Sequence, residues 1–197
     1  MARRSDHSKE ELEKIIFDAA NKLIEKDGLN GLSARKLATV IGYTPGTIYS
    51  FYENLDELIL RVNGKTLDQI YSKLEKSIAK NKARNKAIKA IAESYLNYGQ
   101  KNINRFRTLF EFNYLQDGKK ELPDWYQDKV SKNFGLIEAV LTGNQCSDQS
   151  EINAKVLWSG LHGIAMLSLN GKLDSVKLKS SQVLLDSFVE IFLRGLK

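Results

Sequence analysis

Residues 33–58 read SARKLATVIGYTPGTIYSFYENLDEL, and this segment carries start and stop signals for two short helices. Ser33 is a favoured N-cap residue, and Gly42 stands where helices commonly end in a left-handed residue. Just beyond the turn, Thr44 offers a second N-cap. Pro45 follows at a first helical position, where its missing N–H costs no hydrogen bond. The segment therefore predicts two helices joined by a tight turn.

This pair of helices, expected over 34–41 and 45–51, has the form of a helix-turn-helix. That motif places its second helix in the major groove of DNA. Ile41 and Ile48 can pack the two helices together. Three small hydroxyl side chains share one surface of the second helix and can reach base edges or phosphates: Thr44, Thr47 and Ser50. The geometry alone leaves an ordinary helical hairpin open as the alternative.

Apolar residues at three- and four-residue spacing predict helices on both sides of this motif. One helix precedes it and ends before Gly28. A long helix over roughly 55–80 begins at Asn54 and Glu57, which have the spacing of a capping box. The later helices are expected over roughly 85–101, 103–116, 123–141, 149–170 and 177–195. No β-type alternation of convincing length and no internal repeat breaks this pattern.

These patterns together predict an all-α fold. The chain has 197 residues, of which 42% are hydrophobic and 27% charged, and only two are prolines. This composition is typical of a folded, largely helical protein rather than a disordered one. We expect a three-helix helix-turn-helix domain over 1–54, followed by a helical bundle domain over 55–197.

The net charge of +6 is weak evidence for a nucleic-acid partner, because its distribution does not follow the motif. Residues 1–55 contain as many acidic as basic side chains, and the positive excess lies within 56–120. A case for DNA binding must therefore rest on the local pattern. A protein that binds DNA without sequence preference, through the Lys-rich stretch from Lys80 to Lys89, remains the alternative.

Several classes of protein are excluded by composition. No stretch approaches the roughly 20 apolar residues that a membrane-spanning helix needs, so we expect no membrane partner. The single cysteine, Cys146, cannot form an internal disulfide or a multi-cysteine metal site, which suits the cytoplasm. The chain has two histidines and lacks a glycine-rich phosphate loop, an HExxH motif or a paired nucleophile and base. We therefore expect no enzyme, no metal site and no cofactor.

The run from Ser33 to Leu58 resembles the DNA-binding signature of the TetR family of transcriptional regulators. The resemblance implies that the second helix is the recognition helix, with Tyr49 touching phosphate, and that the preceding helix meets the DNA backbone. The residues expected to contact DNA are Ser33, Arg35, Lys36, Thr44, Pro45, Gly46, Thr47, Tyr49 and Ser50. Two departures affect the expected affinity: Leu55 stands where the family usually has a phosphate-binding lysine, and Ser50-Phe51-Tyr52 replaces the commoner basic-His-Phe ending.

The resemblance also implies the function of the whole chain. We expect a ligand-responsive regulator, a repressor by analogy with the family, that binds a near-palindromic operator in double-stranded DNA as a dimer. Its C-terminal domain is then the site of effector binding and dimerisation. The resemblance does not identify the effector beyond a small molecule.

Aromatic residues are dense from Tyr95 to Trp125 and are compatible with an effector pocket, although ordinary core is the other interpretation. Trp158-Ser-Gly-Leu-His162-Gly163 is similar to the Trp-His-Gly signature of one subclass of TetR C-terminal domains. The residues expected to bind the ligand are Phe106, Phe110, Tyr114, Trp125, Trp158, His162 and Met166.

The last two helices are expected to form a homodimer through roughly 149–170 and 177–196. The final segment has too broad an apolar surface for a helix with one buried face, so a partner would cover the excess. Gly160 and Gly163 lower helix propensity, for which the close approach of another helix, in this chain or a partner, would compensate. A central helix buried within one chain is the alternative.

Overall fold

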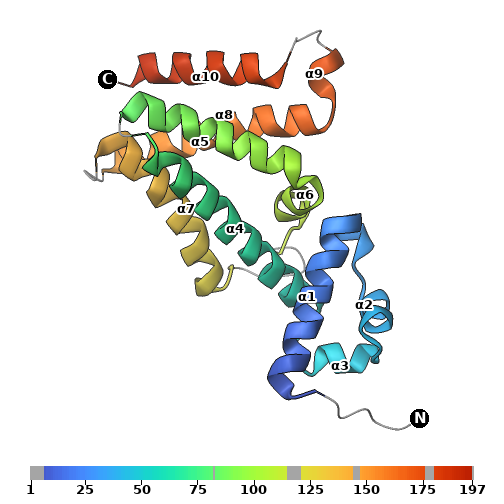
Figure 1. Cartoon of the computed structure of the whole chain (residues 1–197). Helices are drawn as coiled ribbons and strands as arrows, with labels where there is room; N and C mark the ends of the chain where they lie inside the picture. Colours follow the sequence, from blue (N-terminus) through green and yellow to red (C-terminus); the bar gives the residue numbers. More distant parts are fainter. Residues whose placement is uncertain (1–6, 82, 115–120, 144–146, 176–179, 197) are drawn as a thin grey trace. The chain divides into compact units, whose positions relative to one another are not determined.

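The computed structural model describes residues 7–81, 83–114, 121–143, 147–175 and 180–196, and within these ranges the regular elements are helices alone (Figure 1). They are α1 (Lys9–Asp27), the 3₁₀ helix η1 (Leu29–Gly31), α2 (Ala34–Ile41), α3 (Pro45–Tyr49), α4 (Leu55–Ala79), α5 (Arg84–Lys101), α6 (Ile103–Glu111), α7 (Asp124–Thr142), α8 (Asp148–Leu169), α9 (Lys172–Ser175) and α10 (Ser181–Gly195). The predicted all-α fold is confirmed. Cys146 lies outside the described residues.

The contacts divide the chain into two compact units. The N-terminal unit comprises residues 1–66 and 104–122, and the C-terminal unit comprises 67–103 and 123–197. Each of the two units therefore contains two separate stretches of chain. The division along α4 falls after Thr66.

The N-terminal unit is built on one apolar core shared by α1, α2, α3 and the start of α4. Helix α1 begins at a capping box, in which Ser8 accepts a hydrogen bond from the Glu11 N–H and Glu11 accepts one from the Ser8 N–H. Its apolar face packs on the neighbouring helices, and the fully buried members of this core are Ile16, Ala20, Ile24, Leu37, Ile48, Leu58 and Val62.

The first turn of α6 is anchored on the last turns of α1 within the same unit. Asn104 Nδ2 donates to the backbone oxygens of Glu25 and Lys26, at 3.0 and 2.8 Å, which satisfies carbonyls that a helix end leaves open. The buried Arg105 guanidinium donates to Asn21 Oδ1 at 2.9 Å and to Glu25 Oε2 at 3.1 Å. A buried charge is tolerated there because it is paired and hydrogen-bonded.

We expect Arg105→Leu to lower the free energy of unfolding by about 2 kcal/mol, because it leaves Asn21 Oδ1 buried without its donor. The loss should stay below that of a fully buried ion pair, since the Glu25 side chain is 63% exposed and stays hydrated. The double variant Asn21→Leu/Arg105→Leu should recover part of the loss. Denaturant titrations measure the free energy of unfolding of both variants, with the exposed Arg84→Leu as the control. A loss in the double variant equal to the sum of the two single-variant losses would contradict this pairing of Arg105 with Asn21.

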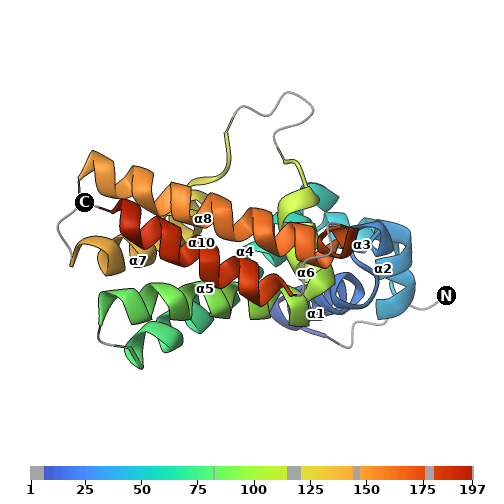
Figure 2. The ribbon, with the colours of Figure 1, turned by 90° about the horizontal axis from the view of Figure 1, so that it is seen from above.

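The C-terminal unit is a bundle in which α5, α7, α8 and α10 pack on one another (Figure 2). Helix α5 supplies much of its buried surface, including Ile88, Ile91 and Tyr95. Gly160 of α8 lies against α10, where an added Cβ would come within 2.1 Å of the Phe188 ring. The close approach expected at Gly160 is therefore provided by a helix of the same chain.

Helix ends differ from the expected ranges where tertiary contacts or caps intervene. Helix α6 ends at Glu111 rather than near residue 116, and Phe112 packs against the core of the N-terminal unit. Helix α3 ends at Tyr49 rather than 51, where the Ser50 hydroxyl donates to the Thr47 backbone oxygen. Helix α10 begins at the Ser180 cap rather than near 177. The short elements η1 and α9 were not expected.

Candidate DNA-binding surface

Helix α2 has the predicted caps at both ends. The Ser33 hydroxyl accepts a hydrogen bond from the Lys36 N–H at 3.2 Å. Gly42 adopts φ 74° and ψ 26°, the left-handed conformation that L side chains rarely adopt, and its N–H bonds to the last carbonyls of α2. Tyr43 N–H donates to the Ala38 oxygen at 3.0 Å and completes the turn. These local bonds set the direction in which the chain enters α3.

Helix α3 is short and is fixed by its buried side. Thr44 is its N-cap residue and Pro45 its first residue, as expected, but the Thr44 hydroxyl makes no capping bond to the backbone. It forms a hydrogen bond with the Thr47 hydroxyl instead, with the two oxygens 3.2 Å apart. Ile48 is fully buried, and Tyr52, just beyond the helix, is also buried. This anchoring decides which side of α3 faces solvent.

The solvent-facing side of α3 carries most of the residues predicted to contact DNA. Thr44, Pro45, Gly46 and Ser50 are exposed, and Thr47 is half-buried beside Thr44. The Tyr49 side chain is 48% exposed, which is unusual for a large ring in this unit. A hydroxyl-rich surface with one projecting tyrosine can donate to phosphate oxygens and base edges.

The predicted backbone contacts in α2 are also exposed, but one of them is already engaged. Lys36 Nζ lies 2.7 Å from Asp27 Oδ2 at the end of α1. The hydrogen bond from Lys36 holds the pKa of the Asp27 carboxyl below its usual value. Arg35 is exposed and forms no ion pair with any residue that the structure describes. A phosphate contact by Arg35 would therefore break no ion pair among the described residues, whereas a contact by Lys36 would replace its pair with Asp27.

Two features near the turn were not identified from the sequence. His7 Nδ1 and the Tyr43 hydroxyl are hydrogen-bonded at 3.0 Å, which ties the residue before the Ser8 cap of α1 to the turn between α2 and α3. Leu55, where the family resemblance predicts a lysine, is half-buried and packs against the core of the N-terminal unit. The loss of a basic side chain at Leu55 is thus accompanied by a gain in apolar packing.

The seven residues predicted to bind a ligand fall in both units. Phe106, Phe110 and Tyr114 belong to the N-terminal unit, where Phe106 is fully buried and meets Phe110 edge-on with ring centroids 4.9 Å apart. The other four belong to the C-terminal unit: Trp125, Trp158, His162 and Met166. The structure therefore does not gather the seven within one unit.

Trp158 and His162 are the members of this set with the most defined geometry. Their rings stack with centroids 5.3 Å apart, and Phe134 meets Trp158 edge-on. Trp158 Nε1 donates to the Tyr95 hydroxyl at 3.2 Å, and that hydroxyl lies 3.1 Å from His162 Nδ1. An indole N–H can only donate, so the Tyr95 hydrogen remains to donate to His162 Nδ1. This arrangement favours a neutral imidazole.

Burial lowers the pKa of His162, and this predicts a pH-dependent stability. In the unfolded chain the imidazole titrates near its ordinary pKa of 6.5. Below that pH the unfolded state takes up a proton that the folded state resists, so the free energy of unfolding should fall as pH drops through this range. Thermal unfolding between about pH 5 and 8 measures this, and His162→Gln should reduce the dependence. An unchanged slope in the variant would contradict the assignment.

Comparison with known proteins places this surface within a family. Residues 16–62 match the family described as "Bacterial regulatory proteins, tetR family", and residues 88–192 match "Tetracyclin repressor-like, C-terminal domain". An uncharacterized HTH-type transcriptional regulator of Mycobacterium tuberculosis is 23% identical over 82% of this chain and 72% of its own length. The HTH-type transcriptional regulator PksA of Bacillus subtilis is 21% identical over 93% of this chain and 88% of its own length.

Solved structures share the fold over nearly the whole chain. A protein of unknown function from Rhodococcus sp. RHA1 has a TM-score of 0.78 and 19% identity, with 99% of both chains covered. The transcriptional regulator FadR from Bacillus subtilis, solved in complex with stearoyl-CoA, has a TM-score of 0.65 and 15% identity over 94% of this chain and all of its own. Among the described helices, none is both long and apolar enough to span a bilayer.

Proposed function

The chain belongs to the tetR family of bacterial regulatory proteins, and we propose that it is a ligand-responsive repressor that binds a near-palindromic operator as a dimer. A regulator of this family acts on transcription and is not an enzyme. We assign DNA binding to the domain over residues 1–54, and effector binding and dimerisation to 55–197. The cytoplasm, where DNA is accessible, is the proposed location.

The observation that carries this proposal is the outward side of α3. A helix fixed by the buried Ile48 presents the paired hydroxyls of Thr44 and Thr47 beside the exposed ring of Tyr49. Helix α2 adds Ser33 and Arg35 at its exposed start. We propose that the hydroxyls reach base edges and that Tyr49 and Arg35 bind phosphate, with Pro45, Gly46, Ser50 and Lys36 completing the contact surface.

A gel shift with the DNA upstream of the protein's own gene tests this function. At about 150 mM salt, the complex should survive an excess of unrelated duplex, because base contacts add to the phosphate contacts. A complex that unrelated duplex displaces equally well would instead support binding without sequence preference.

The dimer is supported by apolar side chains left exposed on α8 and α10. On α8, Ile152, Val156 and Leu167 share one helical face with Ser159 and Gly163. An added Cβ at Gly163 would meet nothing within 4 Å of this chain. On α10, Val183 and Ile191 lie on the exposed side. We propose that these two faces, which we call the α8/α10 stripe, pair with their copies across a two-fold axis.

We propose that the effector contacts the aromatic cluster of the C-terminal unit. Trp158, His162 and Met166 are half-buried on α8, and the Tyr95 hydroxyl adds a polar group among apolar rings. That mixture is typical of small-molecule sites. The same residues, with Gly163, support assignment to the Trp-His-Gly subclass. Binding there would shift the chain toward a conformation with lower operator affinity, which releases DNA.

A further inference from the structure

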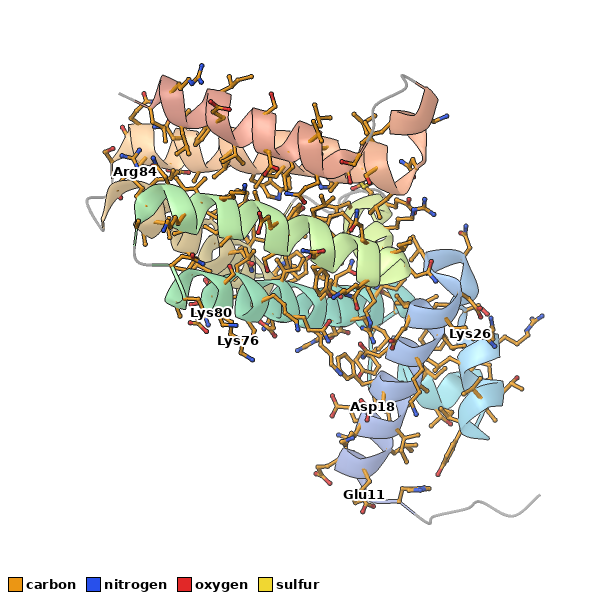
Figure 3. All side chains as sticks on the ribbon, turned by 45° about the horizontal axis from the view of Figure 1, so that its top comes forward. Glu11, Asp18, Lys26, Lys76, Lys80 and Arg84 are labelled. Carbon is orange, nitrogen blue, oxygen red and sulfur yellow. The ribbon has the colours of Figure 1, made fainter. Side chains whose placement is uncertain are left out.

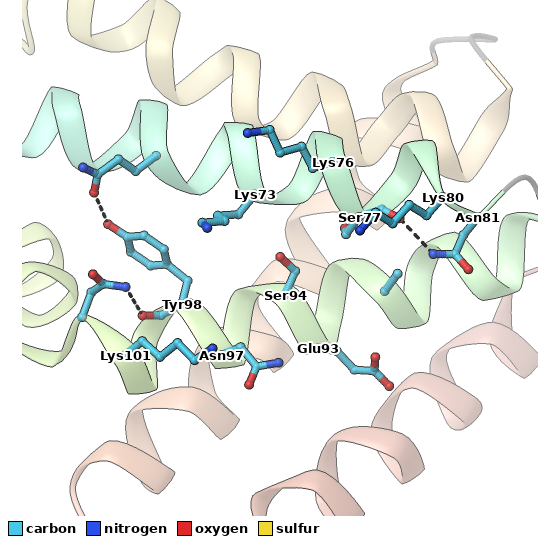
Figure 4. Close-up of a pocket in the computed structure, with 13 residues that line it drawn as sticks. Lys73, Lys76, Ser77, Lys80, Asn81, Glu93, Ser94, Asn97, Tyr98 and Lys101 are labelled. Atoms are coloured by element: carbon cyan, nitrogen blue, oxygen red, sulfur yellow. Dashed lines mark hydrogen bonds between the residues drawn. The ribbon is translucent and has the colours of Figure 1, made fainter.

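A polar groove lies between α4 and α5 in the C-terminal unit (Figure 4). Its volume is about 880 Å³, within the range of small-molecule sites. None of the seven predicted ligand residues lines it. Among its lining residues, the buried Tyr98 of α5 donates a hydrogen bond to Gln69 Oε1 of α4 at 2.8 Å. This groove therefore differs from the aromatic cluster in both position and chemistry.

The groove is distinguished by its positive charge. Lys73 and Lys76 of α4, Lys80 just after its last residue, and Lys101 of α5 line it, against a single carboxylate, Glu93. Lys73, Lys76 and Lys80 are spaced by three and four residues, which places them on one side of α4 and its end, and Lys76 and Lys80 project from the same side (Figure 3).

None of these four lysines pairs with a carboxylate among the residues that the structure describes. Elsewhere in the same unit, Lys89 pairs with Asp186 at 3.1 Å and Lys129 pairs with Asp68 at 2.6 Å. Like charges three or four residues apart on a helix repel one another. An anion bound in the groove would attract each of these lysines and so offset their mutual repulsion.

The spacing of the charges indicates what kind of anion fits. Lys73 and Lys80 are seven residues apart, a separation of about 10 Å at the rise of a helix, which is more than one phosphate group spans. The α5 side of the groove is polar but less basic: Ser94, Asn97 and Glu93 line it, and Ser94 points toward α4 (Figure 4). A carboxylate at this position disfavours a continuous phosphate chain and favours a hydroxyl or amino group.

We propose that this groove binds an organic polyphosphate of the nucleoside di- or triphosphate class. The phosphates lie along Lys73, Lys76 and Lys80, since lysine binds phosphate as a point charge. The hydroxyl- and amine-bearing part of the ligand lies against Asn97 and Glu93. This site is independent of operator recognition. A strand of nucleic acid is the less favoured occupant, because the groove carries the carboxylate of Glu93.

Calorimetry on the full chain at about 150 mM salt tests the site with ATP, inorganic triphosphate and adenosine as probes. ATP and triphosphate should bind once per chain, and adenosine should not bind. The variant Lys76→Gln/Lys80→Gln should weaken the binding of both anions by at least about tenfold, because it removes two charge-assisted bonds to phosphate. Glu93→Gln should weaken ATP and spare triphosphate.

The matched control is Lys86→Gln/Lys155→Gln, which removes the same charge from exposed positions outside the groove. It should stay within about twofold of the parent chain, because exposed charges act weakly at this salt concentration. Equal weakening in both double variants, or no binding of ATP and triphosphate to the parent chain, would overturn the proposal. So would displacement of ATP by single-stranded DNA that depends on Lys76 and Lys80, which would assign the groove to nucleic acid.

Discussion

Replacing Thr47 and Tyr49 together by alanine should abolish specific operator binding. A side-chain contact to a base edge is worth about 1–3 kcal/mol, and the loss of a phosphate contact adds to it, so we expect a loss of about 100-fold or more. The fold should persist, because Tyr49 is half-exposed and Ile48, which anchors α3, is unchanged. Fluorescence anisotropy with a labelled operator measures the loss.

Two further variants separate contact from folding. Tyr49→Phe removes only the hydroxyl and should weaken binding to all sequences alike, as expected for a phosphate contact. Asn30→Ala changes an exposed neutral residue of η1 in the same unit and should leave binding unchanged. Operator affinity that is the same in Thr47→Ala/Tyr49→Ala as in the parent chain would exclude α3 as the recognition helix.

Placing aspartate on the α8/α10 stripe should convert the dimer to monomers. Ile191 is 67% exposed and Val156 is 52% exposed in the single chain, so either substitution is tolerated by the monomer fold. In the proposed dimer each aspartate would meet its copy near the two-fold axis, where a buried unpaired charge costs several kcal/mol. Sedimentation of Ile191→Asp and Val156→Asp should therefore show monomers at concentrations where the parent chain is dimeric.

The control for this experiment is Asn85→Asp, an exposed position in the first turn of α5, where an added carboxylate is tolerated. It should remain dimeric. Dimers that persist in both stripe variants would show that the interface lies elsewhere. Monomers in the control would show that an added charge at any exposed position is sufficient to dissociate the dimer.

The features of the DNA-binding surface that could be predicted from sequence are those fixed by neighbours in the chain. The Ser33 cap and the left-handed Gly42 depend on bonds within four residues, and both predictions are confirmed. The ion pair of Lys36 with Asp27 joins residues nine apart, and the bond of His7 with Tyr43 joins residues 36 apart. No local pattern indicates such pairs, because they depend on how α1 packs against the turn.

The C-terminal unit also has features that local sequence patterns could not predict. The periodicity indicated helices over most of this unit, but it could not show which face of α4 would remain open to form a basic groove. Gly160 and Gly163 were equivalent in the sequence, since both lower helix propensity. The structure separates them, because Gly160 lies against Phe188 and Gly163 has open space. Only the packing of α8 on α10 makes that distinction.

If α3 reads a specific sequence on two-fold-related half-sites, selection from a pool of random duplexes should recover that sequence. We expect enrichment of a near-palindromic sequence whose half-sites are about one helical turn or a multiple of it apart, and which the Thr47→Ala/Tyr49→Ala variant does not enrich. A pool that shows no enriched sequence after binding at about 150 mM salt would contradict it, since only phosphate contacts would then remain.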